Sequence, residues 1–215
     1  MSLRTVSNVL LLAVFCSSGF SCSSLHRAAT SLVRPGQIVE HAAGSAPKEA
    51  PDLYRSGVAS LEAQKYDEAI QSFDTFLLQN PTSAWTQAAM LNTGRAFEGS
   101  KKWPEAAAKY RSVVQATGRA PKLRAMALYR LSFCSEAIGD DTQVVVTLND
   151  LLSRTAYLPR EVGSAELPAR LAGAYARVGN FDQAQVYYRK AEVGISRLKQ
   201  ESGGKNPEWL AQTLF

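Results

Sequence analysis

The stretch that decides the fold runs from Leu53 to Pro81 and reads LYRSGVASLEAQKYDEAIQSFDTFLLQNP. Five positions in it share a fixed spacing: a small residue, a turn residue nine later, a small residue three later, a bulky residue four later and an apolar residue three later. These positions are Gly57, Tyr66, Ala69, Phe73 and Phe76. Apolar residues at this spacing, divided by a short polar turn, predict a pair of amphipathic helices.

The same five-point pattern occurs three more times along the chain. The further copies are Gly94, Trp103, Ala106, Tyr110 and Val113; Ser132, Asp141, Val144, Leu148 and Leu151; and Ala172, Phe181, Ala184, Tyr188 and Ala191. Successive leading residues lie 37, 38 and 40 positions apart. Because a fixed period marks a repeat architecture, each unit is predicted to be a helical hairpin, with boundaries near 51–82, 83–119, 120–158 and 163–202.

These units predict an all-α fold, in which small residues let the two helices of a hairpin approach and stacked hairpins bury a continuous core. The units resemble the tetratricopeptide repeat (TPR) family, most clearly over 53–81, 89–114 and 168–191. The resemblance implies a right-handed superhelical solenoid of about four TPR hairpins, with a concave side formed by the first helices. The third unit departs from the family pattern at Asp141 and Val144.

A finer resemblance points to the bacterial cell envelope. The repeat length, Tyr54, the run from Tyr66 to Ile70, and Asn80-Pro81 are similar in style to BamD-like barrel-assembly lipoproteins and CpoB-like Tol-Pal-associated proteins. CpoB-like proteins carry an N-terminal coiled coil, and no heptad pattern is present here. The resemblance is therefore to the class of envelope TPR lipoproteins and to no single protein.

The N-terminus is typical of an export signal. Arg4 supplies a positive start, and the mostly apolar run over 6–15 is too short to cross a bilayer. The sequence Gly-Phe-Ser-Cys over 19–22 resembles a bacterial lipobox, which implies a lipoprotein-type signal peptide over 1–21 and lipidation of Cys22. Two or more acyl chains would form a stable anchor. An ordinary signal peptide cut just before this cysteine, which would leave a soluble periplasmic protein, is the alternative.

Two further segments flank the repeats. Residues 22–50 are rich in Ser, Ala and Gly and contain Pro35 and Pro47, so they are predicted to be a flexible linker. Ser23 resembles the residue that directs lipoproteins to the outer membrane. After Gly203-Gly204, residues 203–215 predict a short C-terminal helix. This helix either caps the solenoid with its apolar side chains Trp209, Leu210 and Leu214, or begins a fifth repeat.

Composition argues against an enzyme. The 215-residue chain is 46% hydrophobic and 20% charged, which is typical of a globular protein. Both histidines, His26 and His41, precede the repeats, and Cys134 is the one cysteine within them, in an apolar run that predicts burial. The repeats therefore lack a histidine base and a multi-cysteine metal site. No catalytic residue, metal or cofactor is predicted.

By resemblance, TPR partners bind in the groove lined by the first helices. The groove positions of this chain are Tyr54, Val58, Leu91, Arg95, Tyr129 and Phe133, together with Glu98, Glu136 and Arg177. For Leu91 and Phe133, helix–helix packing is an equally good interpretation. Aromatic and arginine side chains favour a protein partner, because they dominate interface energetics.

A second candidate surface is basic. Residues 101–130 carry a net charge of +7, whereas the whole chain carries +5. The predicted basic patch consists of Lys101, Lys102, Lys109, Arg111, Arg119, Lys122 and Arg124. An acidic protein or lipid headgroups could bind there, and a merely solvated surface is the simplest alternative. Nucleic acid is not expected, because aromatic side chains are not interleaved at the spacing that single strands need.

The sequence thus predicts a lipid-anchored TPR scaffold that binds other envelope proteins within a multiprotein complex, at the periplasmic face of the outer membrane. No small-molecule substrate is expected. The alternative is a structural or peptidoglycan-associated lipoprotein without a dedicated peptide ligand.

Overall fold

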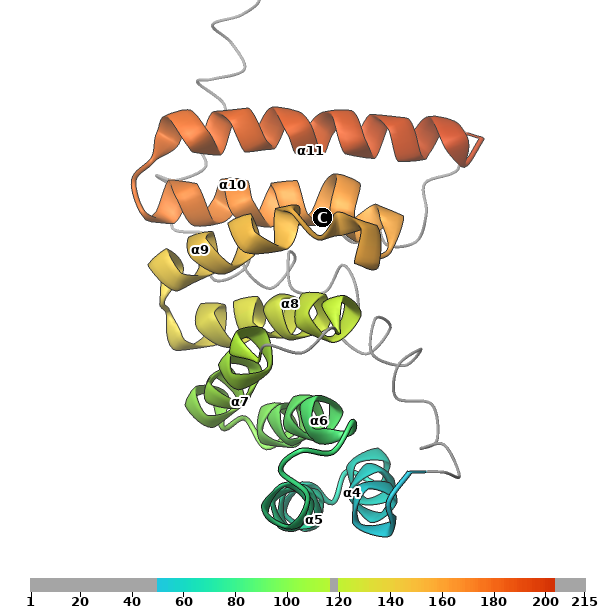
Figure 1. Cartoon of the computed structure of the whole chain (residues 1–215). Coiled ribbons are helices and arrows are strands. Elements are labelled where there is room, and N and C mark those ends of the chain that lie inside the picture. Colours follow the sequence, from blue (N-terminus) through green and yellow to red (C-terminus); the bar gives the residue numbers. More distant parts are fainter. Residues whose placement is uncertain (1–49, 117–119, 204–215) are drawn as a thin grey trace, which may run out of the picture.

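The computed structural model describes residues 50–116 and 120–203 (Figure 1). Outside these residues lie the predicted signal peptide, Cys22, the linker up to residue 49, Arg119 and the C-terminal helix beyond Gly203. Within them, no helix is both long enough and apolar enough to cross a membrane.

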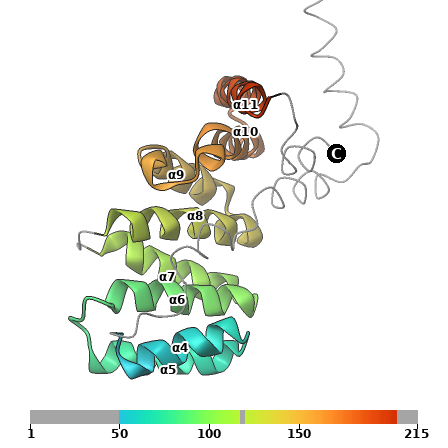
Figure 2. The same cartoon turned by 90° about the vertical axis from the view of Figure 1, so that its right-hand side faces the viewer.

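Eight α-helices form four consecutive hairpins in the described part of the chain, which confirms the predicted all-α repeat architecture. They are α4 (Asp52–Glu62) with α5 (Tyr66–Gln79), α6 (Thr86–Gly99) with α7 (Trp103–Gln115), α8 (Pro121–Ile138) with α9 (Asp141–Leu152), and α10 (Leu167–Arg177) with α11 (Phe181–Glu201). Each helix packs against the next one in the chain. The hairpins therefore stack in sequence order into one elongated array (Figures 1 and 2).

The turn inside each hairpin has one backbone position in common. Seven residues after the small leading residue, the chain takes a positive φ, at Gln64 (59°), Lys101 (60°), Gly139 (83°) and Gly179 (80°). A left-handed residue ends a helix by redirecting the chain. In the last two hairpins the next residue, Asp140 or Asn180, caps the second helix. Its side chain accepts a hydrogen bond from the backbone N–H of the residue three positions later.

The connection between the third and fourth hairpins is the most irregular part. A 3₁₀ turn covers Thr155–Tyr157, and a π-helical turn over Val162–Glu166 leads directly into α10. Helix α11 has 21 residues and α10 has only 11. The π turn and α10 both pack against α11. The inserted turn adds length here, consistent with the 40-residue interval between the last two units.

The small leading residues lie where the hairpin helices cross, as predicted. A Cβ atom added to Gly94 would lie 2.6 Å from the Tyr110 ring, and one added to Gly57 would lie 2.7 Å from the Phe73 ring. The fourth unit departs from the prediction, because Tyr188 is 53% exposed and its neighbour Tyr187 is buried. No following hairpin in the described residues covers Tyr188, and α11 turns a different stripe towards α10 and the π turn.

Candidate partner-binding face

Successive first helices are joined by three polar contacts, two of which connect equivalent repeat positions. Asn92 donates a hydrogen bond to the Tyr54 hydroxyl at 3.1 Å. Arg130 contacts Glu98 at 2.7 Å, and Arg170 contacts Glu136 at 2.9 Å. Both glutamates stand four residues after a small leading residue, and Asn92 and both arginines stand two residues before the next one. We call these three contacts the polar ladder; it runs from α4 through α6 and α8 to α10.

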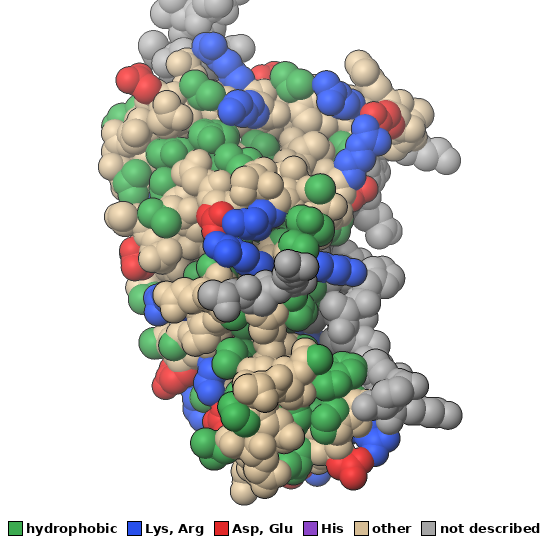
Figure 3. All heavy atoms as spheres, viewed as in Figure 1, with side chains coloured by type: hydrophobic (Ala, Val, Ile, Leu, Met, Phe, Trp, Pro, Cys, Tyr) green, Lys and Arg blue, Asp and Glu red, His purple; other side chains and the backbone are tan. Residues whose placement is uncertain are grey.

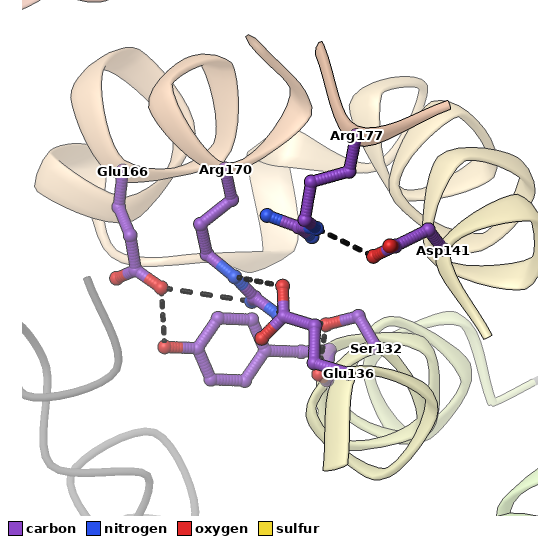
Figure 4. Close-up of polar contacts among 7 residues, drawn as sticks. Ser132, Glu136, Asp141, Glu166, Arg170 and Arg177 are labelled. Carbon is purple, nitrogen blue, oxygen red and sulfur yellow. Dashed lines mark hydrogen bonds and ion pairs between the residues drawn. The ribbon is translucent and has the colours of Figure 1, made fainter. Parts of the chain in front are cut away.

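The last rung of the polar ladder is buried between α8 and α10 (Figure 4). Arg170 donates from Nη2 to Ser132 Oγ at 2.7 Å and from Nε to Glu136 Oε1 at 3.2 Å. Its guanidinium also stacks on the Phe133 ring, 3.7 Å from the ring centroid. The charged group is thus held by hydrogen bonds and by a cation–π contact at once.

Glu166 lies beside this rung, at the end of the π turn. Its Oε1 accepts a hydrogen bond from the Tyr129 hydroxyl at 2.9 Å and lies 3.8 Å from Arg170 Nη1. Its Oε2 is buried and has no hydrogen-bond partner among residues 50–116 and 120–203. The pKa of Glu166 is raised to about 7, chiefly by burial and to a smaller extent by nearby Glu136, against the opposing effects of Arg170 and the Tyr129 hydrogen bond. Protonation of this side chain is therefore accessible near neutral pH.

The middle rung lies between α6 and α8. Glu98 accepts hydrogen bonds from Arg130 Nη1 and from the Tyr110 hydroxyl, both at 2.7 Å. Arg95, one turn earlier, donates to the neutral Asn92 amide at 3.1 Å. Burial and the charge of Arg130 lower the pKa of Arg95. Arg95 is half-buried and has no carboxylate within ion-pair distance among the described residues.

The predicted groove needs a correction. Its five uncharged members are all buried, with exposed fractions of 9% or less: Tyr54, Val58, Leu91, Tyr129 and Phe133. They belong to the core because the first helices lie close enough for these side chains to meet neighbouring helices; the Tyr54 ring, for example, packs against Trp85. Of the six principal groove positions, Arg95 alone is half-buried. Arg177 pairs with Asp141 at 2.6 Å.

The predicted basic patch is interleaved with acidic side chains from other helices. Lys102 contacts Asp67 at 3.3 Å and Lys109 contacts Asp74 at 2.8 Å, in both cases across 35 residues from α7 to α5. Arg124 lies 3.6 Å from Asp150 on α9. Lys101, Arg111 and Lys122 are exposed. Basic side chains on the face in Figure 3 accordingly lie in separate groups.

The sequence interpretation missed Arg170, Ser132 and Glu166 as members of a polar cluster. A signal for the ladder was present, since Glu98 matches Glu136 and Arg130 matches Arg170 when the repeats are aligned. Glu166 has no such signal, because the π turn that holds it occurs in one connection of the described chain.

Metal and thiol chemistry find no support in residues 50–116 and 120–203. No group of three His, Cys, Asp or Glu side chains there could hold a metal ion. Cys134 is buried, and burial raises the pKa of its thiol to about 12. It therefore packs as a small apolar side chain.

Comparison with known proteins supports the repeat assignment. Residues 53–83 match the family model described as the tetratricopeptide repeat. The chain carries tetratricopeptide-type repeats. The solved crystal structure of MamA is similar to this fold with a TM-score of 0.56 and 16% sequence identity, over 79% of this chain and 90% of that one. At this identity the likeness concerns the fold. No curated protein matches the chain in sequence.

Proposed function

We propose that this TPR-type protein is an interaction scaffold of the bacterial cell envelope, anchored through a lipid on Cys22 at the periplasmic face of the outer membrane. The repeats and the fold support the scaffold role. The export signal and the lipobox-like sequence over 19–22 support the envelope and the anchor. Its partners are other envelope proteins, bound as a peptide segment or as a folded domain.

The polar ladder is the observation that carries the scaffold proposal. Buried ion pairs at Glu98–Arg130 and Glu136–Arg170 join α6, α8 and α10 across repeat boundaries. A surface held in one geometry loses less conformational entropy when a partner binds. The first-helix face is therefore preorganised, as a docking surface requires.

On that face, Arg95 is the side chain best placed to contact a partner. It is half-buried, and no carboxylate of the described residues lies within ion-pair distance of its charge. An acidic side chain of a partner would complete its contacts. An alternative surface is offered by exposed basic side chains: Lys101 in the turn before α7, Arg111 on α7 and Lys122 at the start of α8.

The test begins with covalent cross-linking in the native envelope and mass spectrometry of what co-purifies with the intact protein. The affinity of each identified partner is then measured for Arg95→Ala, for Lys122→Glu, and for Arg189→Ala as a control on α11. Binding through the first-helix face predicts a loss of tenfold or more for Arg95→Ala alone. Binding through the basic side chains predicts loss for Lys122→Glu and a steep decline as salt rises. Full affinity in all three variants would contradict both surfaces.

The burial of five predicted groove side chains favours a second candidate function, a structural or peptidoglycan-associated lipoprotein. Such a protein needs no open groove. It should co-sediment with purified peptidoglycan, and cross-linking should enrich no protein above the level of an unrelated envelope lipoprotein. A specific partner without co-sedimentation would favour the scaffold.

The anchor is tested separately. Wild-type protein should partition into the detergent phase of a Triton X-114 separation and should carry acyl groups on an N-terminal Cys22. Cys22→Ser should give a precursor or a protein in the aqueous phase. A mature wild-type N-terminus elsewhere, with aqueous partitioning, would show that the chain is exported without this anchor.

A further inference from the structure

The outer face of α11 is the face that second helices use to pack against the next hairpin. In the first junction, the turn residue Tyr66 lies on Gly99 of the following hairpin so closely that a Cβ atom at Gly99 would collide with its ring. In the third junction, the equivalent turn residue Asp141 pairs with Arg177, which occupies the same repeat position as Gly99. The equivalent residue of α11, Phe181, is 71% exposed.

Two more positions, four and eleven residues after each turn residue, face the next hairpin. In the first three second helices they are apolar and partly or fully buried: Ile70 and Leu77, Ala107 and Val114, Val145 and Leu152. In α11 they are Gln185 and Glu192, and both are exposed. This replacement removes the apolar contacts that another hairpin of the same kind would need, so α11 is not built to receive one in the repeat register.

The α11 face nevertheless keeps two large aromatic side chains. Phe181 and Tyr188 are seven residues apart, hence two helical turns along one side of α11, and Gln185 lies between them. Phe181 is 71% exposed and Tyr188 is 53% exposed. No charged residue stands at these three positions. Exposed aromatic side chains grouped with an uncharged polar side chain are typical of a protein interface.

We propose that this aromatic stripe, formed by Phe181, Gln185 and Tyr188, docks against the same stripe of a second copy of the chain. Two α11 helices placed antiparallel about a twofold axis near Gln185 bring Phe181 of each copy opposite Tyr188 of the other. The Gln185 amide is both a donor and an acceptor, so it can pair with its own twin at the axis. An isologous contact needs a self-complementary patch of this kind.

Head-to-tail stacking fits less well. The outer end of the array is formed by α4 and α5, and α4 exposes the charged Arg55 and Glu62. The Asp52–Arg55 ion pair and the Glu62 carboxylate would be desolvated against the rings of Phe181 and Tyr188, which costs free energy. A heterologous contact would also produce open filaments rather than a closed pair.

The test is cross-linking of the full chain carrying Gln185→Cys with a short bismaleimide, with the parent chain as the background for its own three cysteines. We expect a covalent dimer at least tenfold above that background. Val193→Cys is the matched control, because Val193 is 59% exposed on another side of α11. Adding Phe181→Ser and Tyr188→Ser to Gln185→Cys should reduce the dimer at least tenfold, while thermal melts confirm that the exposed substitutions leave the fold intact.

Sedimentation equilibrium of the uncross-linked full chain provides the second readout. It should show a dimer that Phe181→Ser with Tyr188→Ser converts to a monomer. A monomer at all concentrations, or equal cross-linking at Val193→Cys, would overturn the proposal. So would a Gln185→Cys cross-link confined to another protein or to residues 204–215 of the same chain, since the stripe would then have a different occupant.

Discussion

The Tyr129 hydroxyl on α8 donates a 2.9 Å hydrogen bond to Glu166, which ends the π turn before α10. This contact joins the third hairpin to the fourth through a carboxyl group whose pKa is about 7, above its ordinary value of 4.5. In the described part of the chain, the ionisable groups that face it are Arg170, Glu136 and Tyr129. The junction between the two hairpins is therefore sensitive to pH.

Stability should fall as the pH rises through 7. Because the folded-state pKa of Glu166 is raised, its protonated form favours folding; this contribution is complete below about pH 4.5 and is lost above pH 7. Its size is on the order of 1–3 kcal/mol. Urea unfolding at pH 5.5 and 8.5 should show a smaller pH dependence for Glu166→Gln than for wild type. Glu192→Gln on the exposed side of α11 is the control, and parallel pH profiles for wild type and Glu166→Gln would contradict the expectation.

Replacing one charged side chain of a buried ion pair in the polar ladder should lower the free energy of unfolding far more than replacing both. Arg170→Met leaves Glu136 buried without its cation, for which a loss of about 3–5 kcal/mol in the free energy of unfolding is expected. Adding Glu136→Gln should recover much of that loss. Lys102→Met, in an exposed pair with Asp67, should change stability by less than about 1 kcal/mol. Equal losses for Arg170→Met and Lys102→Met would show that the buried rung has no special weight.

Two glycines should respond in opposite directions to the same substitution. Gly94→Ala places a methyl group 2.6 Å from the Tyr110 ring and should destabilise the fold by about 1–3 kcal/mol. At Gly173, the nearest atom to an added Cβ is the terminal Arg177 Nη1 at 3.3 Å, which can move. Gly173→Ala should thus be neutral or stabilising by up to about 1 kcal/mol, because alanine favours helix. Thermal melts decide the point, and a tolerated Gly94→Ala would refute the close helix crossing.

The thiol of Cys134 should be inert in the folded protein. Its pKa of about 12 and its complete burial leave almost no accessible thiolate at pH 8. Iodoacetamide followed by peptide mass spectrometry should find Cys134 unmodified in native protein and fully modified in 6 M guanidinium chloride. Rapid native labelling, at a rate near that of an exposed cysteine, would mean that α8 opens far more readily than its packing implies.

The hairpins and their order follow from local spacing, so the sequence alone predicted them. The small–bulky pairs Gly57–Phe73 and Gly94–Tyr110 each meet within one hairpin, sixteen residues apart, where helical geometry fixes the contact. The burial of Tyr129 contradicts its predicted place in an open groove, whereas the burial of Phe133 agrees with the helix-packing interpretation. Sequence alone could not decide this, because exposure depends on how closely the next first helix approaches, which no local pattern encodes. The same holds for ion pairs across 32–36 residues, such as Glu98 with Arg130.

Tyr188 illustrates a different limit. Its spacing within the repeat is that of a core residue, and the same position is buried in α5, α7 and α9. In α11 the burial of that position would need a following hairpin, and the pattern within one repeat does not show whether such a hairpin is present. A pattern inferred from internal units thus overstates the core at the end of the array.

The buried apolar side chains fall into two clusters that divide along α6. Ala89 and Ala96 of this helix pack with α4 and α5, whereas Leu91 packs with the larger cluster that extends to α11. The contact that crosses this boundary in the ladder, Tyr54 with Asn92, is also the uncharged one. We therefore expect the first hairpin to open separately from the rest of the array, so that its amide hydrogens exchange with solvent by a partial opening that leaves α8, α9 and α10 protected.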